Sequence, residues 1–281
     1  ALKRWILKNK NFLPSKIIYS SHLVPGEGEH KIFDYIRENK INPGNGNNVV
    51  YGMDADLIVL SILSPLKKIM LMRENYQEIM DIDSLREIII DELKFNGYDR
   101  SLLLKDFSVL VMFVGNDFLP KFPSFIGTND TLLHVFKIYK SLEKHITTTE
   151  NNIEWKAFAS LLVKYFKGDE EKFIPSEMQL FEGIVLEPPN FPYPEIEKVS
   201  SVCGGVVSFD MKNFMRYWYC KQFCPQSGRL AKFFDENRFW TKEDVTKMCK
   251  SFLKTMNWVL VYYIEGYKSV DTHLLYGYRY T

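Results

Sequence analysis

Five carboxylates in three short motifs are the residues best suited to chemistry in this sequence. The motifs are Val-Pro-Gly-Glu-Gly-Glu-His-Lys at 24–31, Gly-Met-Asp-Ala-Asp-Leu at 52–57 and Gly-Asn-Asp-Phe-Leu-Pro at 115–120, with the acidic residues Glu27, Glu29, Asp54, Asp56 and Asp117. Clustered carboxylates repel one another unless cations lie among them, and hard cations such as Mg²⁺ prefer oxygen ligands. Carboxylate clusters that hold two metal ions about 4 Å apart are a common solution for phosphodiester cleavage. The motifs therefore predict the metal site of a nuclease.

Short strand-like runs alternate with helical patterns in the first half of the chain. The runs at 16–20, 48–51 and 69–73 are rich in β-branched, apolar and aromatic residues and are predicted to form strands. Helical patterns at 29–39 and 55–63 lie between them. This alternation is typical of an α/β fold with a mostly parallel sheet flanked by helices.

The first two acidic pairs each follow one of these predicted strands. Glu27 and Glu29 come after the run at 16–20, whereas Asp54 and Asp56 come after the run at 48–51. Ligands in such sheets bind beyond the carboxyl ends of the strands. Both pairs are therefore expected at one edge of the sheet, where they would form a single site.

A mainly helical second region is expected to follow. Within the first region, Ser84 and Glu87 have the spacing of a capping box, which predicts a helix that begins near Asp83. Further helical patterns lie at 131–144, 153–166, 210–223 and 242–263. The expected division is an α/β nuclease region over 1–135 and a mainly helical region over 136–281.

Composition excludes little, because the 281 residues are 46% hydrophobic and 25% charged with a net charge of +1, as in many soluble globular proteins. The longest apolar runs, at 57–63 and 109–114, are far too short to span a membrane. Cys220-x₃-Cys224 alone is a weak zinc signal, so the four cysteines are interpreted as buried free thiols in a reducing compartment. We expect a cytoplasmic protein, with the nucleus as the alternative.

The three motifs resemble the conserved blocks of the XRN-type 5′→3′ exoribonucleases. The matching stretches are Val-Pro-Gly-Glu-Gly-Glu-His-Lys-Ile, Tyr-Gly-Met-Asp-Ala-Asp-Leu-Ile and Phe-Val-Gly-Asn-Asp-Phe-Leu-Pro. Trp258–Gly266 and Tyr276–Thr281 are similar to the second conserved region of that family. The resemblance covers about 17–130 and 250–281. It implies a PIN/FEN-like nuclease core with two Mg²⁺ or Mn²⁺ ions, which degrades single-stranded RNA with a 5′-monophosphate one nucleotide at a time.

The resemblance also implies roles for individual residues. Glu27, Glu29, Asp54, Asp56 and Asp117 match the acidic positions of the family's blocks and would be the metal ligands. Candidate RNA contacts are Lys31 beside a phosphate, His273 or Tyr276 against a base, and Arg279 on the backbone. No protein partner is predicted.

Two departures from the family pattern affect these expectations. The family has two further aspartates and a basic 5′-phosphate pocket upstream of the first block, and nothing in residues 1–26 matches them. We therefore expect the chain to be a piece of a longer, divergent and compact member. The family's Trp-rich stretch corresponds here to 270–275, which contains no Trp.

Three other interpretations stay open. A flap-type 5′ nuclease acting on DNA would use the same metal chemistry, although the blocks at 258–266 and 276–281 argue against it. A catalytically inactive RNA-binding or scaffold member would explain the missing upstream aspartates. Individual acids, such as Glu29 or Asp56, could simply stabilise the start of a helix.

Overall fold

The computed structural model describes residues 2–14, 16–38, 46–73, 78–120, 122, 128–166, 200–203, 206–209, 242–274 and 276–277. Their α-helices are α1 (Leu2–Lys8), α2 (Gly28–Arg37), α3 (Asp56–Leu63), α4 (Ile82–Leu93), α5 (Arg100–Val111), α6 (Thr128–Lys140), α7 (Trp155–Phe166) and α11 (Lys242–Glu265). Short 3₁₀ helices are η1 (Lys10–Phe12), η2 (Met112–Val114) and η6 (Tyr267–Ser269). The strands are β1 (Asn48–Tyr51), β2 (Ile69–Arg73), β3 (Glu78–Asp81), β4 (Ser200–Cys203) and β5 (Val206–Phe209).

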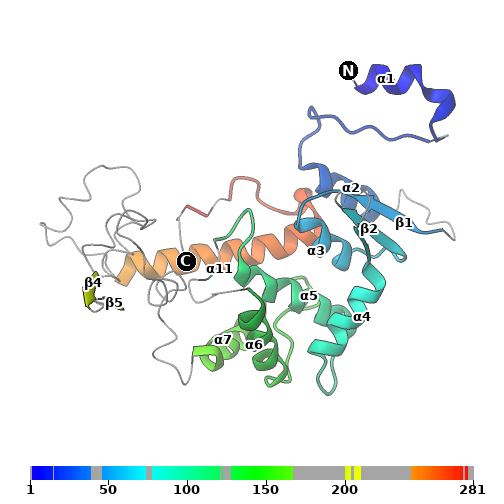
Figure 1. Ribbon diagram of the computed structural model, residues 1–281. Coiled ribbons are helices and arrows are strands. Elements are labelled where there is room, and N and C mark those ends of the chain that lie inside the picture. The colour runs from blue at the N-terminus through cyan, green and yellow to red at the C-terminus, as the bar shows by residue number, and fades with distance from the viewer. Residues whose placement is uncertain are drawn as a thin grey trace, which may run out of the picture.

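A three-stranded sheet in the order β1-β2-β3 confirms the α/β prediction. β1 and β2 are parallel, with Val50 opposite Leu71, and α3 is the crossover helix between them. β3 pairs with β2 in the antiparallel direction and was not predicted. The sheet is flanked by helices (Figure 1), and β4 and β5 form a separate antiparallel pair.

The prediction of a buried strand at 16–20 is wrong. These residues belong to no strand, and Ile17, Ile18 and Tyr19 are exposed. A β-branched run fits a pleated surface, but it becomes a strand only where a neighbour accepts its backbone hydrogen bonds. No described strand pairs with this run. The preceding helix α1 buries none of its residues and lies apart from the other elements (Figure 1).

The start of α4 also differs from the prediction. Asp81 occupies the cap position, and its side chain accepts hydrogen bonds from the backbone N–H groups of Asp83 and Ser84 at 3.0 and 3.3 Å. The Ser84 hydroxyl donates to the same carboxylate. The helix therefore begins at Ile82, because a carboxylate two residues before Asp83 already satisfies the free N–H groups.

One hydrophobic core joins elements from both halves of the chain, between α2 and α11. It includes Phe33, Leu71, Leu110 and Tyr139 as well as Val259 of α11. The core therefore contains residues from both sides of the expected division at 135, and that division stays a prediction. The long helix α11 contacts α2, α3 and α5 (Figure 1).

Two further expectations concern the predicted helices and the cysteines. The helical pattern at 210–223 and the pair Cys220 and Cys224 lie outside the described residues. Cys249 is a free thiol, as expected, but it is exposed and not buried. Within the described ranges, no helix combines the length and the apolar character that crossing a membrane requires.

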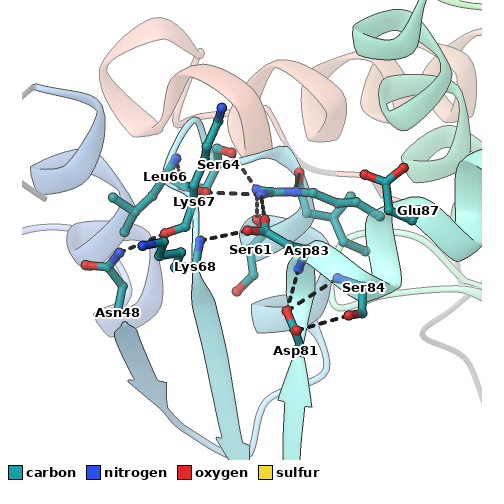
Figure 2. A network of polar contacts seen from close by, with 12 residues as sticks. Asn48, Ser61, Ser64, Leu66, Lys67, Lys68, Asp81, Asp83, Ser84 and Glu87 are labelled. Atoms are coloured by element: carbon teal, nitrogen blue, oxygen red, sulfur yellow. Dashed lines mark hydrogen bonds and ion pairs between the residues drawn. The ribbon is translucent and has the colours of Figure 1, made fainter. Parts of the chain in front are cut away.

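A buried arginine holds the C-terminal end of α3. The guanidinium of Arg86, on α4, forms an ion pair with Asp83 at 2.7 Å. It also donates to the backbone carbonyls of Ser61, Ile62, Ser64 and Leu66, at 2.6, 3.0, 2.6 and 3.1 Å. Figure 2 shows this network around Ser61, Ser64 and Asp83. Since these carbonyls include the last ones of α3, the arginine fixes the direction in which the other end of this helix points.

A second buried polar network joins α5, α6 and the loop after α6. The Asp106 carboxylate is fully buried. It accepts four hydrogen bonds, from Tyr139 Oη (2.5 Å), His145 Nδ1 (2.6 Å), Thr147 Oγ1 (2.6 Å) and the backbone N of Ile146 (3.1 Å). His145 Nε2 in turn accepts from the backbone N–H of Asp99. Every oxygen of this carboxylate is therefore satisfied by the fold itself.

Candidate active site

Four of the five predicted carboxylates lie at the N-terminal ends of two neighbouring helices. Glu27 occupies the cap position of α2, and Glu29 is in its first turn. Asp56 begins α3, and Asp54 lies in the connection from β1 to this helix. Helices α2 and α3 contact each other. Both helix starts carry the positive end of the helix dipole, which favours negative groups there.

The connection between β1 and α3 is tight because of one glycine. A Cβ atom at Gly52 would collide with the end of the Leu57 side chain, so a larger residue would require this side chain to move. Asp54 then turns the chain, as its carboxylate accepts a hydrogen bond of 3.2 Å from the backbone N–H of Asp56. Arg73 of β2 holds the same segment through a 2.7 Å hydrogen bond to the carbonyl of Met53.

The fifth carboxylate, Asp117, projects from a closed loop after η2. The side chain of Asn116 accepts hydrogen bonds from the backbone N–H groups of Phe118 and Leu119, at 2.9 and 2.8 Å. Gly115 enters this loop at φ +88°, a conformation that favours glycine. The loop therefore presents the exposed Asp117 in a defined place.

Burial and mutual repulsion show that the structure brings the carboxylates together. Burial raises the pKa of Glu27, and Glu29, Asp117 and Asp56 raise it further, against a hydrogen bond from Tyr262. Burial also raises the pKa of Asp56, to which Asp54, Asp117 and Glu29 add. The five groups therefore lie within electrostatic range of one another. We call Glu27, Glu29, Asp54, Asp56 and Asp117 the acidic cluster.

The acidic cluster is not a closed metal cage. Within the described residues, no three His, Cys, Asp or Glu side chains are arranged so that they could hold a metal ion. In the same part of the chain, none of the five carboxylates forms an ion pair with Lys or Arg. Glu27, Asp54 and Asp117 are exposed, so the cluster is open to solvent. Its role as a ligand set stays a prediction.

Two tyrosines of α11 hydrogen-bond to the acidic cluster. Tyr262 Oη donates to Glu27 Oε2 at 3.2 Å, and Tyr263 Oη donates to Asp56 Oδ2 at 2.7 Å. Both side chains are buried, as their helical spacing from Trp258 predicts. The spacing did not predict the hydroxyl contacts. A possible signal was the use of Tyr at buried positions, since a buried phenol requires a hydrogen-bond partner that Phe does not.

A buried histidine beside the cluster was also missed. His30, 1% exposed, stacks on Tyr262 with 3.8 Å between ring centroids, and Tyr262 stacks on Trp258 at 4.9 Å. Burial, with a contribution from Arg37, lowers the pKa of His30 to about 4, while Asp54 acts in the opposite direction. The imidazole is therefore neutral at pH 7 and serves as an aromatic wall behind Glu27.

The four residues predicted to contact RNA are more dispersed than the five carboxylates. Lys31 Nζ donates to the carbonyls of Val24 and Ser21, at 2.7 and 3.3 Å, and so holds the loop that precedes Glu27. His273 is exposed in the turn after η6. The ring of Tyr276 packs edge-on against Phe252. Arg279 lies outside the described residues. All four RNA-binding roles stay predictions.

Comparison with protein families identifies the relatives of this chain. Residues 1–75 match the family model described as the XRN 5'-3' exonuclease N-terminus, and residues 97–174 match the one described as the Xrn1 helical domain. These two segments contain all five carboxylates of the cluster. The chain belongs to the XRN family.

Individual XRN relatives agree with this assignment. The chain is 36% identical over 155 residues to 5'-3' exoribonuclease 1 of Schizosaccharomyces pombe, a match that covers 45% of this chain and 12% of that protein. It is 31% identical over 208 residues to 5'-3' exoribonuclease 2 of Yarrowia lipolytica, covering 64% and 20%. The human 5'-3' exoribonuclease 1 is 27% identical over 198 residues, covering 60% and 12%. The chain thus spans about a fifth or less of these XRN proteins.

Proposed function

We propose that this chain carries the metal-binding carboxylates of a 5′→3′ exoribonuclease that hydrolyses 5′-monophosphorylated RNA to mononucleotides. The observation that carries the proposal is the acidic cluster: three separate parts of the chain place five carboxylates within mutual electrostatic range. Membership of the XRN family supports it, since the relatives are named 5'-3' exoribonucleases.

The chemistry of the cluster fits Mg²⁺ or Mn²⁺. The cluster offers oxygen donors only, which hard divalent cations prefer. Burial raises the pKa of Glu27 and Asp56, and repulsion from the neighbouring carboxylates raises it further. Cations bound there would offset this repulsion. Two such ions supply the polarisation of the phosphate and the acidification of water that in-line hydrolysis requires.

The protein itself would bind the cations and orient the RNA. Glu27, Glu29, Asp54, Asp56 and Asp117 would hold the cations, and the electrostatic coupling among them, from α2, α3 and the loop after η2, supports this role. The open side of the cluster would admit the phosphate backbone of a single strand. No side-chain nucleophile is needed for this reaction class, since water is the attacking group.

Contacts to the rest of the RNA are proposed at four residues. Lys31 lies four positions beyond Glu27 and would approach a phosphate after releasing its backbone carbonyls. His273 and Tyr276 would face a base, since aromatic rings stack on any base. Arg279 would contact a phosphate. The proposed place of action is the cytoplasm, with the nucleus as the alternative.

The test compares two RNAs of one sequence, one with a 5′-monophosphate and one with a 5′-hydroxyl, with the intact protein, with and without Mg²⁺. Release of mononucleotides from the monophosphorylated RNA alone, and only with Mg²⁺, is expected. Binding without cleavage would contradict the proposal in favour of an inactive scaffold. Internal cuts, or preference for DNA flaps, would contradict it in favour of a flap-type nuclease.

A further inference from the structure

The two tyrosines of α11 reach two different helices. Tyr262 donates to Glu27 at the start of α2, and Tyr263 donates to Asp56 at the start of α3. Successive residues of a helix point about 100° apart, so neighbouring positions of one helix can serve two separate partners. The helix α11 thereby spans the cluster and joins its two halves.

Packing fixes both hydroxyl groups in place. The ring of Tyr262 lies between His30 and Trp258, with interplanar angles of 19° and 27°. Tyr263 is 3% exposed. Its backbone carbonyl accepts a 3.2 Å hydrogen bond from Arg37 of α2. Because ring and backbone are both held, each hydroxyl meets its carboxylate in one geometry.

The end of α11 is held against α2 as well. The helix ends before Gly266, whose φ is +86°, and a Cβ atom there would collide with the side chains of Asp34 and Arg37. The backbone N–H of Gly266 donates to the carbonyl of Tyr262. The positive φ favours glycine at this point, and the N–H bond to Tyr262 ties the end of α11 to the residue that contacts Glu27.

Each hydroxyl uses one carboxylate oxygen and leaves the other. Tyr262 binds Glu27 Oε2, and Tyr263 binds Asp56 Oδ2. Within the described residues, no hydrogen bond reaches Glu27 Oε1 or Asp56 Oδ1. A carboxylate held by one oxygen presents the other in a fixed direction, as outer-shell partners of metal ligands do.

We propose that Tyr262 and Tyr263 are positioning residues that orient Glu27 and Asp56 for divalent-cation binding, so that α11 is a required part of the metal site. This inference rests on the proposed function, because it assumes that the acidic cluster binds cations. The tyrosines are not themselves ligands or catalytic residues. Their hydroxyls act through the two carboxylates that they hold.

The test measures cation binding directly in the intact protein. Tb³⁺ replaces Mg²⁺ at oxygen sites, and its luminescence is excited through nearby Trp and Tyr, here Trp258, which every variant keeps. The variants Tyr262→Phe and Tyr263→Phe remove one hydroxyl each and keep the ring. We expect the dissociation constant of Tb³⁺ to rise about tenfold in each. Displacement of Tb³⁺ by Mg²⁺ should weaken in parallel.

Tyr139→Phe is the matched control. Tyr139 also donates to a carboxylate, Asp106, but in the buried network between α5 and α6. The substitution removes a tyrosine hydroxyl from a tyrosine–carboxylate hydrogen bond, as the other two do, but this bond lies outside the acidic cluster. Tb³⁺ affinity is expected to stay within about twofold of the unaltered chain, even where the melting temperature falls. Circular dichroism of every variant at the titration temperature shows that the folded protein is being compared.

The possible results distinguish a failure of this inference from a failure of the proposed function. Unaltered Tb³⁺ affinity in both tyrosine variants, with binding intact in the parent chain, overturns the inference and leaves the proposed function standing. Equal weakening in Tyr139→Phe also overturns it, because general loosening would then be the cause. Absence of Tb³⁺ and Mg²⁺ binding in the parent chain overturns both. If one tyrosine variant does not fold, the other decides.

Discussion

Two places in the molecule combine aspartate with tyrosine hydroxyls, and they do so in opposite ways. Asp106 is alone, fully buried, and accepts four hydrogen bonds. Asp56 belongs to a group of five acids, is partly exposed, and has the hydroxyl of Tyr263 as its side-chain partner. Burial and neighbouring carboxylates raise its pKa.

The difference distinguishes a structural carboxylate from a reactive one. A buried charge that the fold satisfies completely has nothing left to offer a ligand, and its value is in holding elements together. Acids that repel one another keep carboxylate oxygens available for a ligand. A bound cation would reduce the repulsion between them. The same residue types therefore serve the fold in one place and chemistry in the other. Four predictions test this contrast.

The largest effect is expected on cleavage. Asp54→Asn and Asp56→Asn each replace a proposed ligand by an isosteric neutral group, and should reduce RNA hydrolysis by the intact protein about a thousandfold or more, roughly 4 kcal/mol of transition-state stabilisation. RNA binding should change little. Initial rates of mononucleotide release at saturating RNA measure the effect. Unchanged turnover in either variant would remove that residue from the site.

Asp106→Ala should act on stability instead. It leaves the hydroxyls of Tyr139 and Thr147 and the ring of His145 without their common acceptor, which should lower the free energy of unfolding by about 3 kcal/mol or more. Urea denaturation at pH 7 measures this loss. Cleavage per folded molecule should not change. Asp91→Ala, an exposed aspartate paired with Lys94, is the control and should have little effect.

His30 should make stability depend on pH. Its pKa is about 4 in the fold and 6.5 as a model value, so the unfolded chain takes up a proton first as the pH falls. This group's contribution is complete above pH 6.5 and is lost between pH 6.5 and 4, by about 3 kcal/mol. The raised pKa values of Glu27 and Asp56 act in the opposite direction at the acidic end. Denaturation series should show a shallower acid loss for His30→Phe, and an identical slope would refute the assignment.

The smallest effect is expected when Asp56→Asn is tested for stability without divalent cations. Since the pKa of Asp56 is raised in the fold, its ionised form disfavours folding above its ordinary value of 3.8. The variant should therefore be more stable than the parent by about 1 kcal/mol or less at pH 7, and the difference should vanish toward pH 3. Thermal melts decide this. A destabilised variant would mean that Asp56 is structural, like Asp106.

The sequence predicted the strands at 48–51 and 69–73 and the helices after 28 and 55 correctly, whereas the role of the acidic cluster stays a prediction. The convergence of the acidic pairs was argued from two strands, and the strand at 16–20 does not form. The helices α2 and α3 contact each other, and each acidic pair lies at or just before the start of one of them. The starts of both helices follow from local pattern, and they lie within one residue of the predicted positions 29 and 55. Pairing of a strand depends on a distant partner, which local pattern does not contain.

The same reasoning explains what was missed. Tyr262 lies 235 positions from Glu27, and Tyr263 lies 207 positions from Asp56. The helical period correctly placed both rings in the core, because burial follows a local repeat. A side-chain hydrogen bond between residues so far apart in the sequence leaves no periodic pattern in that sequence. Asp106 was missed for this reason also, since its partners Tyr139 and Thr147 lie 33 and 41 positions away.

The distance between the acids and α11 has a consequence for the order in which the protein is made. Glu27 and Asp56 leave the ribosome some two hundred residues before the helix that supplies their hydroxyl partners. Domains fold progressively during synthesis, but a contact of this range cannot form until both of its ends are available. The two carboxylates therefore gain these partners only after α11 has been synthesised. A nuclease built in this way would not have a complete site until that helix has left the ribosome as well.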